Sequence, residues 1–152
     1  MTRDRTIAAI VVAAGRGERA SANGENVPKQ YRLLGDTPVL SRTIGALLDV
    51  KSIDRVLPVI HADHAARYLS LGLDDHRLLA PVVGGDQRQA SVLAGLEALA
   101  DSGPDLVLIQ DAARPLIGGA VVEAVIAALD THEGALPVIP VTDTIKRSPD
   151  GR

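Results

Sequence analysis

The sequence predicts an α/β fold in which a mostly parallel sheet carries helices on both faces. Short apolar runs of strand length, beginning with residues 6–13, alternate with helical patterns of roughly ten residues, and this alternation is typical of right-handed crossovers between parallel strands. The chain has no Phe or Trp and only two Tyr. Its core must therefore come from Val, Ile, Leu and Ala, which suits buried strands covered by alanine-rich helices.

The expected elements follow these runs along the chain. Strands are expected at residues 6–13, 55–60, 78–83, 105–110 and 135–141. Helices are expected from Thr37-Pro38 (a capping hydroxyl followed by Pro in the first turn), around 62–71, from Asp86 with Val92, Leu93, Leu96 and Leu99 on its buried face, and at 120–129. Pro58 lacks an N–H, so it indicates an edge strand or a bulge. A length of 152 residues fits one domain, residues 1–152.

Charge and composition exclude several classes of protein. The formal net charge of −3 argues against a nucleic-acid binder or an anionic-membrane binder, because both rely on excess positive charge. The longest apolar run, residues 7–14, is far shorter than the roughly 20 residues that span a membrane. The absence of cysteine excludes thiolate chemistry and fits a reducing compartment, so a cytoplasmic location is expected.

A glycine-containing loop follows the first expected strand, in the stretch 7–19. Gly15 and Gly17 can turn through positive φ and bring backbone N–H groups close to an anion. Arg16, Arg19 and Lys29 add positive charge beside them, so the loop predicts a nucleotide site. A tight turn with solvated arginines remains the alternative. The spacing and types of the loop residues match neither a Walker loop nor a dinucleotide-binding fingerprint.

Two further strands are expected to end in polar loops at the same edge of the sheet. Asp86, Arg88 and Ser91 follow one strand, where backbone groups and Ser91 would recognise a base while Arg88 braces the loops. The alternative is that Asp86 is a helix cap and Arg88 a solvated residue. Asp111 and Arg114 follow another strand, where they could meet a hydrated Mg²⁺ and a phosphate. The alternative there is an Asp–Arg pair that closes a turn.

Histidine gives a weaker signal. His61 and His64 could nominally bind a metal, but Asp63 between them lies on an expected loop, and His76 and His132 have no partner at ligand spacing. Metal chelation by histidine is therefore not expected.

Taken together, five motifs resemble the 2-C-methyl-D-erythritol 4-phosphate cytidylyltransferase family. They are Ala13-Ala14-Gly15-Arg16-Gly17-x-Arg19, Pro28-Lys29-Gln30-Tyr31, Gly84-Gly85-Asp86-x-Arg88-x-x-Ser91, Asp111-Ala112-Ala113-Arg114-Pro115 and Asp143-Thr144-Ile145-Lys146. The resemblance implies a Rossmann-like nucleotidyltransferase fold and transfer of CMP from CTP to a sugar-alcohol phosphate in the non-mevalonate isoprenoid pathway. It also implies a divalent cation, Mg²⁺, and a homodimer formed through an arm that begins near residue 141 and includes Asp143.

The same resemblance assigns roles to individual residues. Arg19 and Lys29 would be catalytic and stabilise the charge of the transition state. Asp111, Arg114 and Thr144 would face the second substrate, partly across the dimer, and Asp111 would help to bind the metal. The residues that would hold CTP are Ala13, Ala14, Gly15, Gly17, Gly85, Asp86, Arg88 and Ser91.

The sequence departs from the family pattern at a few places. Val12 stands where Pro is usual, Gln110 where His is common, the loop 20–27 is slightly long, and the chain stops at Arg152 inside the arm. These departures favour a piece of a larger enzyme, including one fused to a second enzyme of the pathway. Ribitol-5-phosphate cytidylyltransferases share the same motifs, and a sugar-nucleotide pyrophosphorylase is a more distant alternative. A nucleotide-binding module without activity is the alternative from another class.

Overall fold

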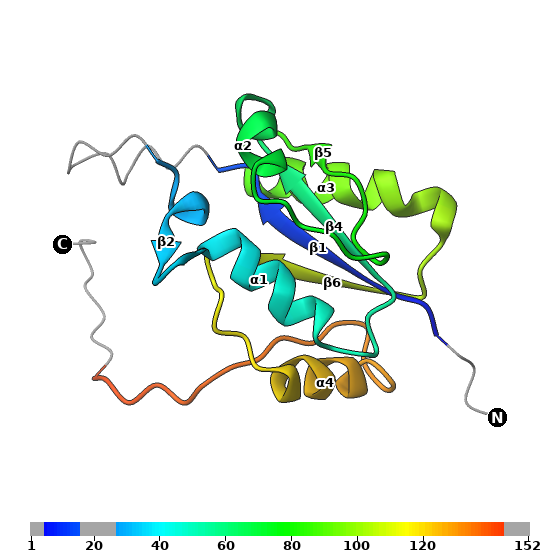
Figure 1. Cartoon of the computed structure of the whole chain (residues 1–152). Helices are drawn as coiled ribbons and strands as arrows, with labels where there is room; N and C mark the ends of the chain where they lie inside the picture. The colour runs from blue at the N-terminus through cyan, green and yellow to red at the C-terminus, as the bar shows by residue number, and fades with distance from the viewer. Residues whose placement is uncertain (1–4, 16–26, 145–152) are drawn as a thin grey trace, which may run out of the picture.

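The computed structural model describes residues 5–15 and 27–144, and its centre is a parallel sheet in the strand order β5-β4-β1-β6. The four strands are β1 (Ile7–Ala13), β4 (Arg55–Ile60), β5 (Val82–Val83) and β6 (Leu106–Asp111). β1 lies between β4 and β6, and the arrowheads of all three point the same way in Figure 1. The chain therefore changes direction across the sheet between β1 and β6, which is where ligands bind in folds of this kind.

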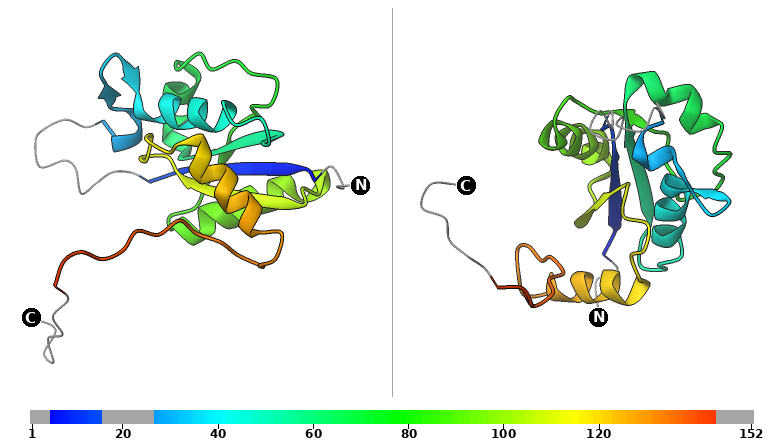
Figure 2. Two further views of the ribbon diagram at one scale, coloured as in Figure 1. Left: turned by 90° about the horizontal axis from the view of Figure 1, so that it is seen from below. Right: turned by 90° about the vertical axis from the view of Figure 1, so that its left-hand side faces the viewer.

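Helices cover both faces of this sheet, as the sequence predicts. α1 (Val39–Leu48) lies on one face and α3 (Arg88–Leu99) on the other, as the end-on view in Figure 2 shows. α4 (Gly119–Ala128) adds Val122 and Ile126 to the core on the α1 face. The smaller elements are α2 (Ala65–Leu69), the 3₁₀ turns Lys29–Tyr31, Ala62–His64 and Ala100–Ser102, and the hairpin of β2 (Leu33–Leu34) with β3 (Thr37–Pro38). No helix in the described ranges is long and apolar enough to cross a bilayer.

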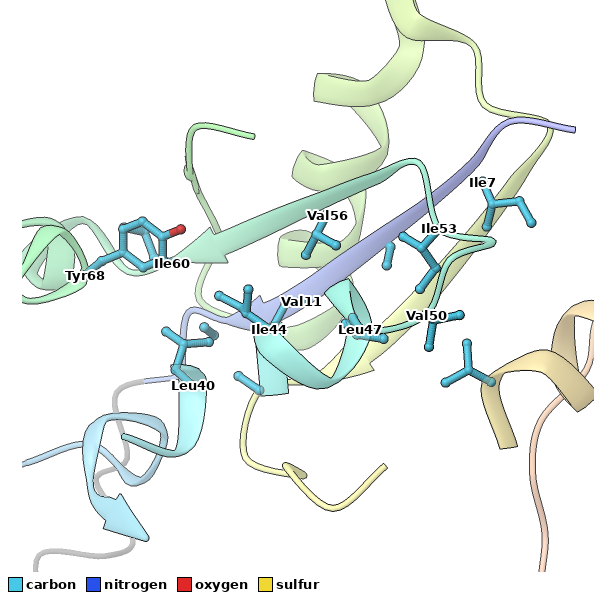
Figure 3. Close-up of a cluster of buried hydrophobic side chains, with 14 of the residues drawn as sticks. Ile7, Val11, Leu40, Ile44, Leu47, Val50, Ile53, Val56, Ile60 and Tyr68 are labelled. Carbon is cyan, nitrogen blue, oxygen red and sulfur yellow. The ribbon is translucent and has the colours of Figure 1, made fainter. Parts of the chain in front are cut away.

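Alternate residues of β1 supply two separate cores. Ile7, Ala9, Val11 and Ala13 face α1, where Leu40, Ile44 and Leu47 meet them, as the close-up in Figure 3 shows for most of these side chains. On the other face Ala8 and Ile10 pack with Leu57, Val59 and Leu99. β1 is buried on both sides, so its sequence is a continuous apolar run, as expected of a central parallel strand.

The prediction of an edge strand at Pro58 is wrong, because β4 pairs with β1 on one side and with β5 on the other. The alternative prediction, a bulge, agrees with the one-residue shift of register between the Val56–Leu78 bridge and the Val59–Val82 pair. Alternate residues of a strand direct their backbone groups to the same neighbour. Val56 donates to Arg77 O and accepts from Leu79 N on the β5 side. Position 58 therefore faces residues 80–81, where the ladder with β5 is interrupted. The missing N–H costs no ladder hydrogen bond at this position.

The predicted buried face of α3 is only partly correct. Leu99 is buried, but the side chains of Leu93 and Leu96 are 55% and 40% exposed. The helix instead presents its small residues to the sheet. A Cβ on Gly95 would lie 2.9 Å from Ile10 and 3.1 Å from Val59, so the glycine permits a close approach of helix and strands. The pattern of large apolar residues thus indicated the wrong face.

Three other sequence predictions need correction. No strand forms at residues 135–141, where Pro137 and Pro140 lack donors and no strand in the described residues pairs with the segment. The strand expected at 78–83 is reduced to β5 and one bridge between Leu78 and Val56. Thr37 does not cap α1, because it lies in β3, and Pro38 occupies the cap position without a side-chain bond.

Candidate active site

The carboxyl ends of β1, β5 and β6 surround one polar pocket of about 520 Å³. Its lining comes from three loops and from the 3₁₀ turn that carries Lys29. The lining residues are Val12, Ala13, Ala14, Gly15, Lys29, Gln30, Gly85, Asp86, Gln87, Arg88, Ser91, Asp111, Ala112, Ala113 and Arg114. Most of the residues predicted as site residues therefore come together, including Lys29, Asp86 and Asp111 from three distant parts of the chain.

The loop after β1 is open at Gly15. In the described residues positive φ occurs at Gly35, Gly72 and Gly103 but not at Gly15, so the predicted left-handed turn is wrong at this position. A Cβ on Gly15 would meet nothing within 4 Å. The glycine therefore leaves space at the pocket wall where a ligand can approach the backbone.

Lys29 reaches this pocket from the first residue of a 3₁₀ turn. The residue is exposed, whereas the next two, Gln30 and Tyr31, are buried. Two buried neighbours anchor the turn, while Lys29 lines the pocket. A point charge on an anchored turn suits an anionic ligand.

The loop after β5 approaches the first loop very closely. A Cβ on Gly84 would lie 2.6 Å from the Ala14 Cβ and 2.7 Å from the Ser91 Oγ, so only glycine fits there. The Ser91 hydroxyl is buried, with Gly85 O at 3.2 Å and Gln87 O at 3.1 Å as acceptors. The cap of α3 is Gln87, without a side-chain bond, so Asp86 is not the helix cap and lies in the pocket lining instead.

Asp111, at the end of β6, joins the second and third loops. Arg88 donates through Nε to Oδ1 of Asp111 at 3.0 Å, and its Nη2 lies 3.0 Å from the same oxygen. Arg114 lies with its Nε 3.1 Å from Oδ2. The bracing role expected of Arg88 is present, and the turn-closing pair between Asp111 and Arg114 is present as well. Two guanidinium groups around one carboxylate leave an excess positive charge, which favours a polyanion.

Three predicted site residues are not among the described residues that line the pocket. Gly17 and Arg19, with Arg16, are outside the described residues. Thr144 is exposed and does not line the pocket. Sequence reasoning quoted Gln30 within a motif but gave it no role, although its side chain is only 5% exposed and lines the pocket. A polar residue between Lys29 and a tyrosine was the available signal.

A second hollow of about 400 Å³ lies between β6, α4 and residues 133–137. Its lining is mainly apolar and contains acidic Asp105 and Glu133 but no Lys or Arg. A pocket without cationic groups is unsuited to phosphate, so the polar pocket is the candidate active site.

Comparison with known proteins identifies the family. The sequence model of the family 2-C-methyl-D-erythritol 4-phosphate cytidylyltransferase matches residues 7–152. The chain belongs to this family. Membership agrees with the resemblance seen in the motifs, and it places the polar pocket in a nucleotidyltransferase fold.

Related cytidylyltransferase sequences include longer proteins. The chain is 44% identical over 145 residues to the bifunctional enzyme IspD/IspF of Rhodospirillum rubrum, covering 95% of this chain and 37% of that protein. It is 49% identical over 144 residues to the bifunctional enzyme IspD/IspF of Paramagnetospirillum magneticum, covering 93% and 36%. The chain thus spans a little over a third of the length of these relatives.

Among solved structures, 4-diphosphocytidyl-2C-methyl-D-erythritol synthase from Anaerococcus prevotii has the same fold. It superposes with a TM-score of 0.80 at 26% identity, over 97% of this chain and 62% of that one. The Rossmann-like nucleotidyltransferase fold expected from the sequence is confirmed.

Proposed function

We propose that this chain is the cytidylyltransferase part of an enzyme that transfers CMP from CTP to 2-C-methyl-D-erythritol 4-phosphate. The observation that carries the proposal is the meeting of three strand-end loops and Lys29 in one polar pocket, in a chain of this family. A pocket of about 520 Å³ is within the size range of small-molecule sites.

The reaction is an in-line displacement at phosphorus. An oxygen of the acceptor phosphate attacks the α-phosphorus of CTP and forms a new P–O bond, while the bond to the bridging oxygen breaks and its electron pair leaves with pyrophosphate. A phosphate monoester has a second pKa near 6 and is mostly a dianion at pH 7, so it needs no general base. The site must then supply alignment and positive charge.

In this mechanism Lys29 and Arg19 stabilise the charge that develops on the phosphates. The residues that hold CTP in this proposal are Ala13, Ala14, Gly15, Gly17, Gly85, Asp86, Arg88 and Ser91. Asp111 and Arg114 orient the acceptor, and Thr144, which does not line the pocket of its own chain, does so across the dimer. The support for this division is that Asp86 and Asp111 lie on separate loops of the same pocket, which Lys29 also lines from a third segment of the chain.

Mg²⁺ is part of the proposal. In residues 5–15 and 27–144 no three His, Cys, Asp or Glu side chains form a group that could hold a metal. Mg²⁺ commonly uses one or two carboxylates together with substrate phosphates, and the pocket offers Asp86 and Asp111. The pocket therefore fits an ion carried by the triphosphate, with Asp111 as its carboxylate, where the ion would neutralise charge on the leaving pyrophosphate.

The proposal includes a homodimer formed through residues 141–152. The described chain that leads into this arm exposes a row of apolar side chains, with Leu136, Val138, Ile139 and Val141 between 69% and 87% exposed. Such a row is typical of a surface that is covered on association. Light scattering tests it: a dimer is expected for the full-length protein and a monomer for Ile139→Asp, whereas a monomeric wild type contradicts the proposal.

A cytoplasmic location completes the proposal, supported by the absence of cysteine. The activity is tested by pyrophosphate release from the full-length protein with CTP and each acceptor. Faster release with 2-C-methyl-D-erythritol 4-phosphate than with ribitol 5-phosphate is expected, and CTP should be preferred to UTP and GTP. CTP binding without turnover on either acceptor would replace the enzyme with a nucleotide-binding module.

A further inference from the structure

Three polar side chains are buried in the described residues, namely Gln30, Thr43 and Ser91. Each directs its donor to a backbone carbonyl in a different loop of the candidate active site. Ser91 belongs to the predicted nucleotide site, but Gln30 and Thr43 have no assigned role. A buried donor that meets a loop carbonyl fixes that loop more firmly than packing alone, because the hydrogen bond is directional.

Gln30 holds the loop after β1. Its Nε2 donates to Ala13 O and to Gly15 O, each at 2.8 Å, so both amide hydrogens are used. The bonds join the turn that carries Lys29 to the two ends of the Ala13–Gly15 segment. Because C=O and N–H point in opposite directions across a trans peptide, fixing Ala13 O also fixes the direction of the Ala14 N–H.

Thr43, on α1, holds the loop after β6. The residue lies on α1 and is 0% exposed, and its hydroxyl donates to Ala112 O at 2.7 Å. The carbonyl of Val39 lies at 3.0 Å as the alternative acceptor within the helix. Ala112 directly follows Asp111 and precedes Arg114 by two residues. The hydroxyl therefore anchors the loop that carries both of these charged side chains.

We propose that Gln30 and Thr43 are positioning residues, with Gln30 ordering the nucleotide half of the site and Thr43 the acceptor half. The inference rests on the proposed function for its kinetic readout. Neither side chain needs to touch a substrate. Each acts by setting the place of a loop, where a displacement of about 1 Å costs up to roughly a hundredfold in rate.

The test compares Gln30→Met and Thr43→Val in the full-length protein. Both replacements keep side-chain volume and remove the donors. Gln30→Met is expected to raise the KM for CTP by about 10- to 100-fold while the acceptor KM stays within about twofold. Thr43→Val is expected to do the reverse, and Thr43→Ser should restore the acceptor KM because it retains the hydroxyl.

Exposed residues of the same types provide the controls. Gln89 and Thr131 are exposed and do not line the pocket, so Gln89→Met and Thr131→Val should leave both KM values and the melting temperature unchanged. If Gln30→Met and Thr43→Val change the two KM values equally, or change neither, the positioning roles are wrong.

Hydrogen exchange separates failure of this inference from failure of the proposed function. Even in a protein that releases no pyrophosphate, Gln30→Met should speed amide exchange at Ala14 and Gly15, and Thr43→Val should speed it at Ala113 and Arg114. Exchange within β1 should stay slow in both variants. Unchanged exchange at these four amides overturns the inference whatever the activity, and an inactive wild type with the expected exchange overturns only the function.

Discussion

Arg88 and Asp111 are 23 residues apart in sequence, yet two nitrogens of Arg88 lie 3.0 Å from the same carboxylate oxygen of Asp111. The contact ties the start of α3 to the end of β6 across the mouth of the pocket. The Arg88 side chain is 58% exposed and that of Asp111 33%. Exposed pairs of this kind contribute little to stability, so we expect the contact to matter for the proposed function rather than for stability.

Asp111→Asn tests this explanation. The change removes the charge that holds Arg88 and Arg114 but keeps the size of the side chain. The free energy of unfolding should change by less than about 1 kcal/mol, while kcat/KM for the acceptor should fall by about 10- to 100-fold. Chemical denaturation and initial-rate kinetics provide the two measurements. A large loss of stability with normal activity would show that the pair is structural.

Lys29→Ala tests the electrostatic part of the mechanism. Because the ammonium group is exposed, the melting temperature should stay unchanged, whereas loss of a transition-state cation should cost at least ~2 kcal/mol, or about 30-fold in kcat. Lys51→Ala is the matched control, since Lys51 is exposed in the turn between α1 and β4. Near-normal turnover of Lys29→Ala would remove Lys29 from the catalytic residues.

Two glycines in the site should respond differently to the same methyl group. Gly84→Ala places a Cβ 2.6 Å from the Ala14 Cβ and should lower the free energy of unfolding by about 1–3 kcal/mol. Gly15→Ala meets nothing within 4 Å, so the fold should be stable, but the methyl group occupies ligand space and should weaken CTP binding at least about tenfold. Thermal denaturation and CTP titration of both variants measure the contrast. Equal effects would contradict it.

Arg77 links the end of α1 to the segment before β4, at the end of the sheet away from the pocket. Its guanidinium donates to Leu48 O at the end of α1, to Val50 O at 3.3 Å and to Ile53 O at 3.2 Å. Arg77→Ala should therefore cost about 2 kcal/mol of stability without changing kcat. Arg77→Lys should recover only part of the loss, because the single ammonium group of lysine cannot reach all three carbonyls that the planar guanidinium contacts. Full recovery by lysine would show that charge alone matters.

His64 predicts a pH dependence of stability. Burial, with His61 and Arg67 nearby, lowers the pKa of His64 below its ordinary value of 6.5, against the opposing charge of Asp63. The unfolded chain then binds the proton more tightly, so stability falls as the pH drops through 6.5 toward the lowered pKa. His64→Leu should reduce this fall in unfolding experiments between pH 8 and 5. An unchanged slope would contradict the assignment.

The alternation of apolar runs was sufficient to predict β1, β4 and β6, because strands with continuous apolar runs, such as β1, are recognisable from their own sequence. It did not predict the short β5 or the lack of a strand at 135–141. It was insufficient for α3. Leu93 and Leu96 suggested a buried face, whereas the close contact of Gly95 with Ile10 sets the true one. A glycine that lets a helix pack closely cannot be told from a loop glycine by sequence alone. Hydrophobic periodicity therefore could not identify Gly95 as part of the buried face.

The candidate site was predictable to the extent that its residues follow strands directly. Asp86 and Asp111 belong together because parallel strands end at one edge, and both line the pocket. Thr43 was not predictable, since its partner Ala112 is 69 residues away and lies on another element. The hydrogen bonds of Gln30 also require residue 30 to fold back onto the end of β1, and no local sequence pattern predicts this contact.

Because the strands are parallel, the end of the sheet away from the candidate active site is available for attaching probes. Gly103 ends the 3₁₀ turn Ala100–Ser102, which leads into the amino end of β6, at the opposite end of that strand from Asp111. A Cβ on Gly103 would touch nothing within 4 Å, but its left-handed φ of 51° favours keeping the glycine itself. Asp101, exposed on the same turn, is therefore the better point for attaching a fluorophore or immobilising the protein on a sensor surface, because the candidate active site lies at the other end of the strands.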